Sequence, residues 1–263
     1  MNAMPSTLFS VEGKTALVTG GAKGVGAMIA ETLCEAGANV IIAARDAKQG
    51  EAFVAGLKGP GEKSFIEADL GNMAGVEALA DSVKKRCDSL DILVNNAGMF
   101  SASAIEDAKA AQWDMEMGLN LRAPFFLTQT LLPLLKASGQ EGDPARIINI
   151  GSIGALWGNS SNGAYAYASS KAAVHQLTRM LASDLTRQGV TVNAIAPGFF
   201  PSDMTDGFFQ AVEGLKEQME MTIPAGRLGS KEDIGGTVIF LCSRAGAYVS
   251  GAVLPVEGAL WQA

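Results

Sequence analysis

Short apolar runs alternate with longer segments of helical period along the chain. Within the longer segments, hydrophobic residues recur every three or four positions, the period of an amphipathic helix. Most of the short runs lack polar alternation, as do strands that are covered on both faces of a parallel sheet. Strands are predicted at 15–19, 39–44, 64–68, 91–95, 146–150, 190–196 and 252–256. Helices are predicted at 24–36, 73–86, 110–137, 165–188 and 231–242.

The alternation of strands and helices predicts an α/β fold. Right-handed crossovers would place the helices on both faces of the sheet. We therefore expect a Rossmann-type, doubly wound, parallel seven-stranded sheet with its ligand site at the carboxyl ends of the strands. No linker or repeat interrupts the pattern, so a single domain is expected over 1–263. The least regular stretch, 198–230, is rich in Phe and Met and is interpreted as a substrate lid.

Charge and composition exclude several classes of protein. The 20 basic residues are outnumbered by 27 acidic ones, a net charge of -7, which argues against a nucleic-acid partner. No apolar run approaches the ~18 residues of a membrane span, and the first residues do not have the pattern of a signal peptide. Three widely spaced cysteines and one histidine form no metal-ligand pattern. We expect a cytoplasmic protein without a metal or membrane partner.

A glycine-rich turn, TGGAKGVG, follows the first predicted strand and opens a helix. Gly20 would permit the tight exit from the strand, Gly24 would let the backbone approach a pyrophosphate, and Gly26 would let the helix pack closely. The helix amino terminus, which includes Val25, offers N–H groups and a positive dipole to phosphates. Alone, such a turn is also compatible with a purely structural role. In a strand–turn–helix unit it favours dinucleotide binding.

The end of the second strand indicates which dinucleotide is bound. A 2′-phosphate calls for a cation there, whereas a free ribose hydroxyl calls for a carboxylate. The strand ends in Arg45, and Lys23 lies in the glycine turn, so NADP(H) is favoured over NAD(H). The alternative is that both are solvated surface charges, and the adjacent Asp46 could be mistaken for a ribose ligand. Asp69 and Leu70, which follow strand three, are expected to border the adenine.

Tyr167 and Lys171 are four residues apart in a predicted helix, so their side chains share one face. A phenol has a pKa near 10, and a nearby ammonium can lower that pKa toward neutral pH. Tyr167 is therefore a candidate general acid/base. As an isolated pair, these two residues would more often be ordinary neighbours on a helix surface. The catalytic interpretation depends on the motifs that accompany them.

Several motifs together resemble the short-chain dehydrogenase/reductase family, single-domain type. They are TGGAKGVG at 19–26, NNAG at 95–98, Asn120 in GLNL, Ser152, YASSK at 167–171, PGFFPSDMT at 197–205 and the segment 227–258. The resemblance covers nearly the whole chain. It implies hydride transfer between a nicotinamide cofactor and a ketone or secondary alcohol.

The same resemblance implies roles for individual residues. Tyr167 would exchange the proton, Lys171 would lower the pKa of Tyr167 and hold the nicotinamide ribose, and Ser152 would hydrogen-bond the substrate oxygen. Asn120 would support a water-linked proton relay behind Lys171. Further residues are implied to line the cofactor, two on the adenine-ribose side and four around the nicotinamide: Asn96 and Gly98, and Pro197, Gly198, Phe200 and Ser202.

The substrate is less well defined by the sequence. The wording of the motifs is similar to that of β-ketoacyl reductases of the rhamnolipid type, and less so to gluconate-type dehydrogenases, so a β-ketoacyl or related ketone reductase is expected. The alternatives are an NAD-dependent polyol, sugar-acid or steroid dehydrogenase and, from another class, a non-catalytic dinucleotide-binding sensor or scaffold. The loop between Ser152 and Tyr167 is about two residues longer than in many relatives.

Three further expectations concern packing and assembly. His175, four residues after Lys171, is interpreted as a packed or interface residue, with a relay role as the alternative. Trp157 either lines the pocket or packs its own loop. The family resemblance of helices 110–137 and 165–188, together with Leu260 and Trp261 near an apolar C-terminal strand, implies a homotetramer.

Overall fold

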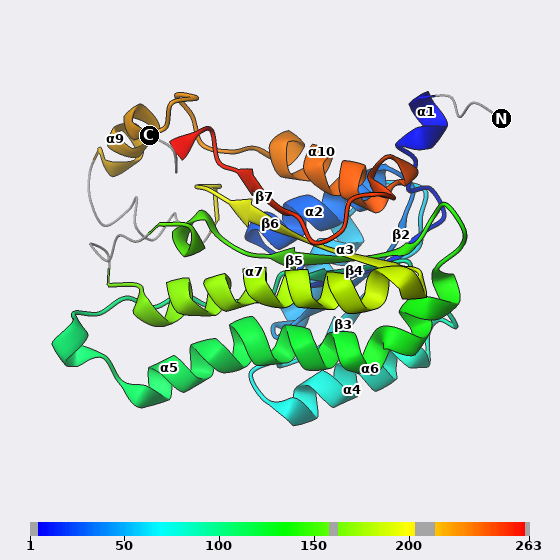
Figure 1. Ribbon diagram of the computed structural model, residues 1–263, viewed down its shortest axis with the longest axis horizontal. Helices are drawn as coiled ribbons and strands as arrows, with labels where there is room; N and C mark the ends of the chain where they lie inside the picture. The colour runs from blue at the N-terminus through cyan, green and yellow to red at the C-terminus, as the bar shows by residue number, and fades with distance from the viewer. Residues whose placement is uncertain (1–4, 158–162, 203–213, 261–263) are drawn as a thin grey trace.

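Seven parallel strands form the centre of the protein, whose computed structural model describes residues 5–157, 163–202 and 214–260 (Figure 1). The strands are β1 (Thr15–Thr19), β2 (Asn39–Ala44), β3 (Lys63–Glu67), β4 (Ile92–Asn95), β5 (Ala145–Ile150), β6 (Val190–Pro197) and β7 (Val253–Val256). Their order in the sheet is β3-β2-β1-β4-β5-β6-β7. The order reverses between β1 and β4, which is the position where a doubly wound sheet opens a crevice for a ligand. The predicted fold class is confirmed.

The helices cover both faces of the sheet. They are α1 (Pro5–Leu8), α2 (Gly24–Glu35), α3 (Ala47–Gly56), α4 (Met73–Lys84), α5 (Ala110–Met117), α6 (Ala123–Ser138), α7 (Tyr165–Leu185), α9 (Leu215–Thr222) and α10 (Lys231–Cys242). Helices α4, α5, α6 and α7 lie on one face of the sheet, whereas α2 and α10 lie on the other (Figure 1). Among the described residues, no helix is both long and apolar enough to cross a membrane.

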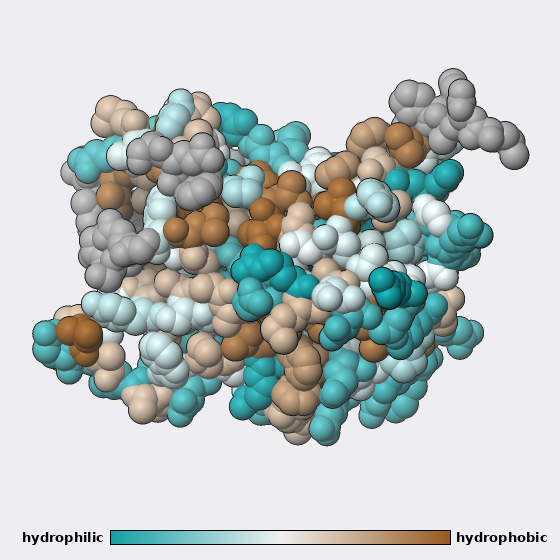
Figure 2. Space-filling model, viewed as in Figure 1, coloured by the Kyte–Doolittle hydropathy of each residue, from teal (hydrophilic) through white to brown (hydrophobic). Residues whose placement is uncertain are grey.

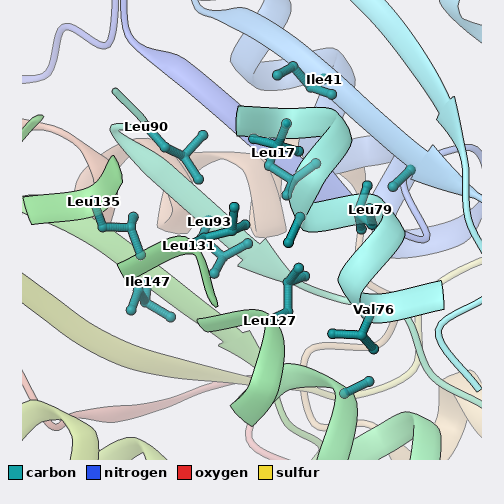
Figure 3. Close-up of a cluster of buried hydrophobic side chains, with 14 of the residues drawn as sticks. Leu17, Ile41, Val76, Leu79, Leu90, Leu93, Leu127, Leu131, Leu135 and Ile147 are labelled. Atoms are coloured by element: carbon teal, nitrogen blue, oxygen red, sulfur yellow. The ribbon is translucent and has the colours of Figure 1, made fainter. Parts of the chain in front are cut away.

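Two hydrophobic cores hold these layers together. The core beneath α4 and α6 joins Leu79 and Leu131 to strand residues such as Leu17 and Leu93, all of them buried (Figure 3). The second core, beneath α2 and α10, is built around Ile42 and other fully buried residues. Because both faces are packed, the inner strands β4, β5 and β6 are buried throughout. Burial on both faces accounts for their lack of polar alternation.

The helix predicted at 110–137 is not a regular α-helix. A π-helical segment, Gly118–Arg122, separates α5 from α6, and Asn120 lies in its middle. Such wide turns often occur at functional sites. A wide turn leaves the period of the hydrophobic residues almost unchanged, so the sequence pattern did not reveal this π-helical segment. Most predicted strand and helix ends lie within two residues of those observed.

Three helices were missed: the four-residue α1, and α3 and α9. In α3 only Gly50 is buried, so the segment has no apolar stripe to reveal it. Helix α9 lies within the predicted lid at 198–230 and has no buried residue. Residues 203–213 of that predicted lid, like Trp261, lie outside the described part of the chain.

Candidate active site

A cavity of about 1450 Å³ opens at the carboxyl ends of the strands. Its walls come from the turns after β1, β2, β4, β5 and β6, together with the start of α7 and part of α9. Thus the glycine-rich turn and the Ser152, Tyr167 and Lys171 side chains, which are far apart in the sequence, line one space. Segments that follow adjacent parallel strands meet at one edge of the sheet, which explains why they converge.

The glycine-rich turn is shaped by the absence of side chains. Gly20 and Gly24 have φ angles of 62° and 53°, a conformation that favours glycine. A Cβ atom on Gly26 would lie 2.3 Å from both the carbonyl oxygen of Gly20 and Nδ2 of Asn96. The side chain of Lys23, the N-cap residue of α2, makes no capping hydrogen bond to this helix, and Gly24, Val25 and Gly26 at its amino terminus line the cavity. The backbone here fits a phosphate group that approaches the helix dipole.

Asn96 links this turn to the strand next to β1. Its Nδ2 donates to the carbonyl oxygens of Thr19 and Gly20, at 2.8 and 3.1 Å. In return, Oγ1 of Thr19 accepts hydrogen bonds from the backbone N–H groups of Asn96 and Ala97. Asn96 and Gly98 line the cavity, as the resemblance implied. The bonds to the turn add a positioning role for Asn96 that sequence reasoning missed.

Two cations, and one carboxylate that already accepts a hydrogen bond, lie around the end of β2. Arg45 and Lys23 both line the cavity. The Asp46 side chain accepts a hydrogen bond of 2.9 Å from the backbone N–H of Gln49 and so caps α3. Because the Asp46 carboxylate serves as a helix cap, this arrangement fits a 2′-phosphate better than a free ribose hydroxyl. Helix α3, which was missed, is therefore what determines the role of Asp46.

Only one of the two residues expected at the adenine lies in the cavity wall. Leu70 lines the cavity, whereas Asp69 is absent from its wall. Oδ1 of Asp69 accepts from the backbone N–H of Gly71 at 3.1 Å, and its Oδ2 accepts from the Asn72 side chain. Asn72 in turn caps α4. The structure therefore places the Asp69 carboxylate in the turn that leads into α4.

Tyr167 and Lys171 face the cavity from the same side of α7, and Ser152 faces it from the end of β5. The Lys171 Nζ atom lies 5.7 Å from the centre of the Tyr167 ring and donates a 2.7 Å hydrogen bond to the carbonyl oxygen of Ile150. Oγ of Ser152 accepts from the backbone N–H of Gly154 at 3.0 Å. The edge of the Phe100 ring packs against the Tyr167 ring, with centroids 5.1 Å apart.

The electrostatics differ from the sequence interpretation. The pKa of Tyr167 is raised, mainly by burial and further by Glu116, while a hydrogen bond with Ser152 acts to lower it. Burial lowers the pKa of Lys171 to about 8. We expected the lysine to lower the pKa of the tyrosine. The Lys171 amine instead donates to the carbonyl oxygen of Ile150, and the Tyr167 phenol is in its neutral form at neutral pH.

Asn120 lies behind this group and outside the cavity wall. Its side chain accepts from the backbone N–H of Met99 and donates to the Met99 carbonyl, both at 2.9 Å, and it also donates to Ser170. A Cβ atom on Gly98 would lie 3.2 Å from Oδ1 of Asn120 and 3.5 Å from Nζ of Lys171. Asn120 and Lys171 therefore both lie close to the position that a side chain on Gly98 would occupy.

The remaining expected residues also have defined places. Pro197, Gly198, Phe200 and Ser202 line the cavity after β6, and Trp157 lines it from its loop. His175 is buried on α7, and its Nε2 has no hydrogen-bond partner among the described residues. Burial, with Lys171 and Arg179, lowers the pKa of His175 to about 4. No group of three or more His, Cys, Asp or Glu residues in the described part could hold a metal ion.

Sequence reasoning missed part of the apolar wall. These residues do not share one motif. Phe100 and Ala102 come from the loop after β4, Phe199 from the segment after β6, and Leu215 and Met219 from α9, a helix that was not predicted. The predicted lid at 198–230 was the only signal for Leu215 and Met219, whereas Phe199 also lies in the PGFFPSDMT motif.

Comparisons with known proteins agree with this geometry. A family described as enoyl-(acyl carrier protein) reductase matches residues 20–260. The rhamnolipids biosynthesis 3-oxoacyl-[acyl-carrier-protein] reductase of Pseudomonas aeruginosa is 44% identical over 95% of this chain and 97% of its own length. The 3-oxoacyl-[acyl-carrier-protein] reductase FabG of Staphylococcus aureus is 38% identical over 94% of this chain and 98% of its own.

Solved structures are similar over almost the whole chain. The Pseudomonas aeruginosa RhlG/NADP active-site complex has a TM-score of 0.92 at 43% identity and covers 97% of this chain and 99% of its own. A putative NAD(P)-dependent gluconate 5-dehydrogenase from Beutenbergia cavernae, with bound NADP, has a TM-score of 0.86 at 33% identity and covers 97% and 100%.

The fold and the shared cavity define a nucleotide-dependent oxidoreductase. With the matches above, the chain belongs to the short-chain dehydrogenase/reductase family, in the part described by the enoyl-(acyl carrier protein) reductase model.

Proposed function

We propose that this protein is an NADPH-dependent reductase of 3-oxoacyl thioesters. The observation that carries the proposal is that one cavity is lined both by the glycine-rich amino terminus of α2 and by Ser152, Tyr167 and Lys171. The two relatives above with 38–44% identity are 3-oxoacyl-[acyl-carrier-protein] reductases, which supports the choice of substrate.

The residues would divide the chemistry of ketone reduction between them. NADPH, when bound, supplies the hydride to the carbonyl carbon. Ser152 and Tyr167 would donate hydrogen bonds to the carbonyl oxygen, where negative charge develops. Tyr167, held neutral by its raised pKa, would give that oxygen its proton. Lys171 would bind the nicotinamide ribose, and Asn120 would hold the Met99 backbone behind the site.

The nucleotide would lie along the turns after β1, β2, β4 and β6. The α2 terminus at Gly24–Gly26 would take the pyrophosphate, and Arg45 with Lys23 would take the 2′-phosphate. The capping role of Asp46 supports NADPH over NADH. Leu70 would border the adenine, while Asn96 and Gly98 would line its ribose.

The wall of the cavity favours an acyl chain over a sugar acid. Apolar side chains of Phe100, Phe199, Leu215 and Met219 line the part near Tyr167 and α9. A sugar acid would require polar partners for each hydroxyl group, because an unpaired buried hydroxyl is unfavourable. The similar fold of a gluconate dehydrogenase makes a sugar-acid substrate the second candidate. We also propose that the 198–230 segment is a substrate lid within a single domain over 1–263.

The direct test is to monitor NADPH oxidation with three substrates: a 3-oxoacyl thioester, a 2-enoyl thioester of the same chain length and 5-keto-gluconate. We expect turnover with the 3-oxoacyl thioester and at least a tenfold lower kcat/KM with the other two. NADH should support a lower kcat/KM than NADPH. Binding of NADPH without turnover of any ketone would instead indicate the sensor or scaffold alternative.

A homotetramer in the cytoplasm is proposed as the working form. Exposed apolar side chains on α5, α6 and α7, namely Met115, Phe125 and Met180, support one interface between copies. Hydrophobic residues also gather over the edge strand β7, which supports a second (Figure 2). Three free cysteines are consistent with a reducing compartment. Light scattering of the purified protein should give four times the chain mass of 27.2 kDa.

A further inference from the structure

The segment 99–103, directly after the NNAG motif, divides its residues between two sides. Phe100 and Ala102 line the cavity. The alternate residues are anchored to the scaffold. Met99 is bound by the side chain of Asn120, and the backbone N–H of Ser103 donates to the carbonyl of Gly163 at 3.1 Å. Alternation of this kind is typical of an extended chain, whose side chains point to opposite sides. The segment is thus one wall of the site.

Glu116 supplies the anchor in the middle of this wall. Oγ of Ser101 donates a hydrogen bond to Oε1 of Glu116. Glu116 lies one helical turn before Asn120, so consecutive turns of the helix hold Ser101 and Met99. The Glu116 side chain is fully buried, and its Oε2 has no hydrogen-bond partner among the described residues. Burial of a carboxyl group disfavours its charged form, so this site favours the neutral acid.

The anchor is connected to Tyr167. Phe100, the residue between Met99 and Ser101, packs edge-on against the Tyr167 ring. The charge of Glu116 also acts on Tyr167 directly, in the direction that opposes ionisation of the phenol. Burial raises the pKa of Glu116 above its ordinary value of 4.5, although the Ser101 backbone and the Gln112 side chain act in the opposite direction. Protonation of Glu116 therefore changes the field at the tyrosine.

We propose that Glu116 is a positioning residue for Tyr167. Through Ser101 it holds Phe100 against the tyrosine ring, and when ionised it places a buried negative charge near the phenol. This inference rests on the proposed function, because it assigns a role to a residue around the same acid/base. At a pH where Glu116 is ionised, its charge makes it harder for Tyr167 to release a proton. Alcohol oxidation requires that proton release.

The other ionisable groups on neighbouring elements are few. On α7, Tyr167 and Lys171 face the cavity beside Phe100, and Lys171 would partly offset the charge of Glu116. Lys109, Asp114 and Arg122, on and around α5, are exposed to solvent, which screens their charges. Asp114 is therefore a matched control, since it has a carboxylate on the same helix but lies at the surface.

The test is the pH profile of kcat for oxidation of a 3-hydroxyacyl thioester by NADP⁺. Glu116→Gln retains an oxygen that can accept from Ser101 but cannot ionise. We expect its rising limb to shift to lower pH by about one unit, the size of a charge effect in a partly buried site. Asp114→Asn should leave the limb unchanged. A Glu116→Gln limb that coincides with the wild type, or moves to higher pH, would overturn the proposal.

A second variant separates anchoring from charge. Glu116→Val removes both the hydrogen-bond acceptor for Ser101 and the charge. We therefore expect KM for the thioester to rise at least fivefold, while the Kd for NADPH stays within twofold. Glu116→Gln should restore KM to within twofold of the wild type. Equal KM values for Glu116→Val and the wild type would contradict the anchoring role.

A stability measurement tests the charge without any activity. Because the pKa of Glu116 is raised on folding, its contribution to stability is fully present below about pH 4.5 and is lost as the pH rises through the raised pKa. Glu116→Gln should therefore gain stability over the wild type between pH 5 and pH 9. If no ketone is reduced, the proposed function fails, and this difference still supports the buried charge. A difference that is constant with pH would overturn the inference.

Discussion

The two halves of the cavity differ in which part of the chain forms their walls. The half around the glycine-rich turn consists largely of backbone, with φ angles and close approaches that exclude side chains. The half around α7 consists of side chains from several loops, several of them buried ionisable groups with shifted pKa values. The first half should therefore be sensitive to added atoms, and the second to changes of charge and pH.

Adding a single methyl group in the backbone half should have the largest effect on NADPH binding. Gly26→Ala would place its Cβ 2.3 Å from the Gly20 carbonyl, an atom of the rigid backbone. We expect the Kd for NADPH to rise at least 100-fold and the free energy of unfolding to fall by about 2 kcal/mol, within the range for overpacking. Gly236→Ala, where nothing lies within 4 Å of the added atom, is the control and should stabilise α10 by up to about 1 kcal/mol. Similar Kd values for both variants would refute the steric account.

Arg45→Ala sharpens the comparison, because it tests a charge-dependent part of the nucleotide half. Loss of the cation should raise the Kd for NADPH about 10- to 100-fold, while the Kd for NADH changes less than threefold. Both constants can be measured by fluorescence titration of the reduced cofactors. An equal loss for both cofactors would mean that Arg45 does not bind the 2′-phosphate.

The side-chain half should respond to pH through Lys171. Its pKa, lowered by burial to about 8, means that its ammonium form is lost above that pH. We expect kcat/KM for ketone reduction to be level below about pH 8 and to fall about tenfold per unit above it. The profile from pH 6 to 10 checks this. A profile that stays level to pH 10 would show that the bound cofactor keeps Lys171 charged.

The smallest effect on cofactor binding and turnover is expected at His175, which is buried but does not line the cavity. Its folded-state pKa of about 4 lies below the ordinary 6.5, so its contribution to stability is present above pH 6.5 and is lost as the pH falls toward 4. The loss is about 1.4 kcal/mol per unit at most. His175→Gln should reduce this acid dependence in urea unfolding at pH 7, 6 and 5. Parallel curves for both proteins would contradict it.

The same contrast explains how far the sequence could predict the molecule. The strands and the glycine turn follow from local pattern, and the doubly wound parallel sheet was expected from the crossover rule. The order of the seven strands was not predicted and comes from the structure. Gly26 is recognisable because its constraint lies within one motif. By contrast, the contact of Phe100 with Tyr167 depends on packing between distant segments.

Glu116 was missed for a related reason, although a signal was present. It shares the buried stripe of its helix with Asn120, Ala123 and Leu127, at helical spacing. An acid on such a stripe marks a buried carboxyl. Its partner Ser101 could not be found from periodicity, because their hydrogen bond joins an extended loop to a helix.

The most direct test is to measure NADPH binding and turnover on the same Tyr167→Phe protein. The substitution removes one oxygen from the side-chain half and leaves the glycine turn unchanged. We expect the Kd for NADPH to stay within about threefold of the wild type, while kcat for 3-oxoacyl reduction falls at least 1,000-fold, the upper range for loss of a general acid. Turnover within tenfold of the wild type, with the cofactor still bound, would contradict the assignment of Tyr167 as the proton donor.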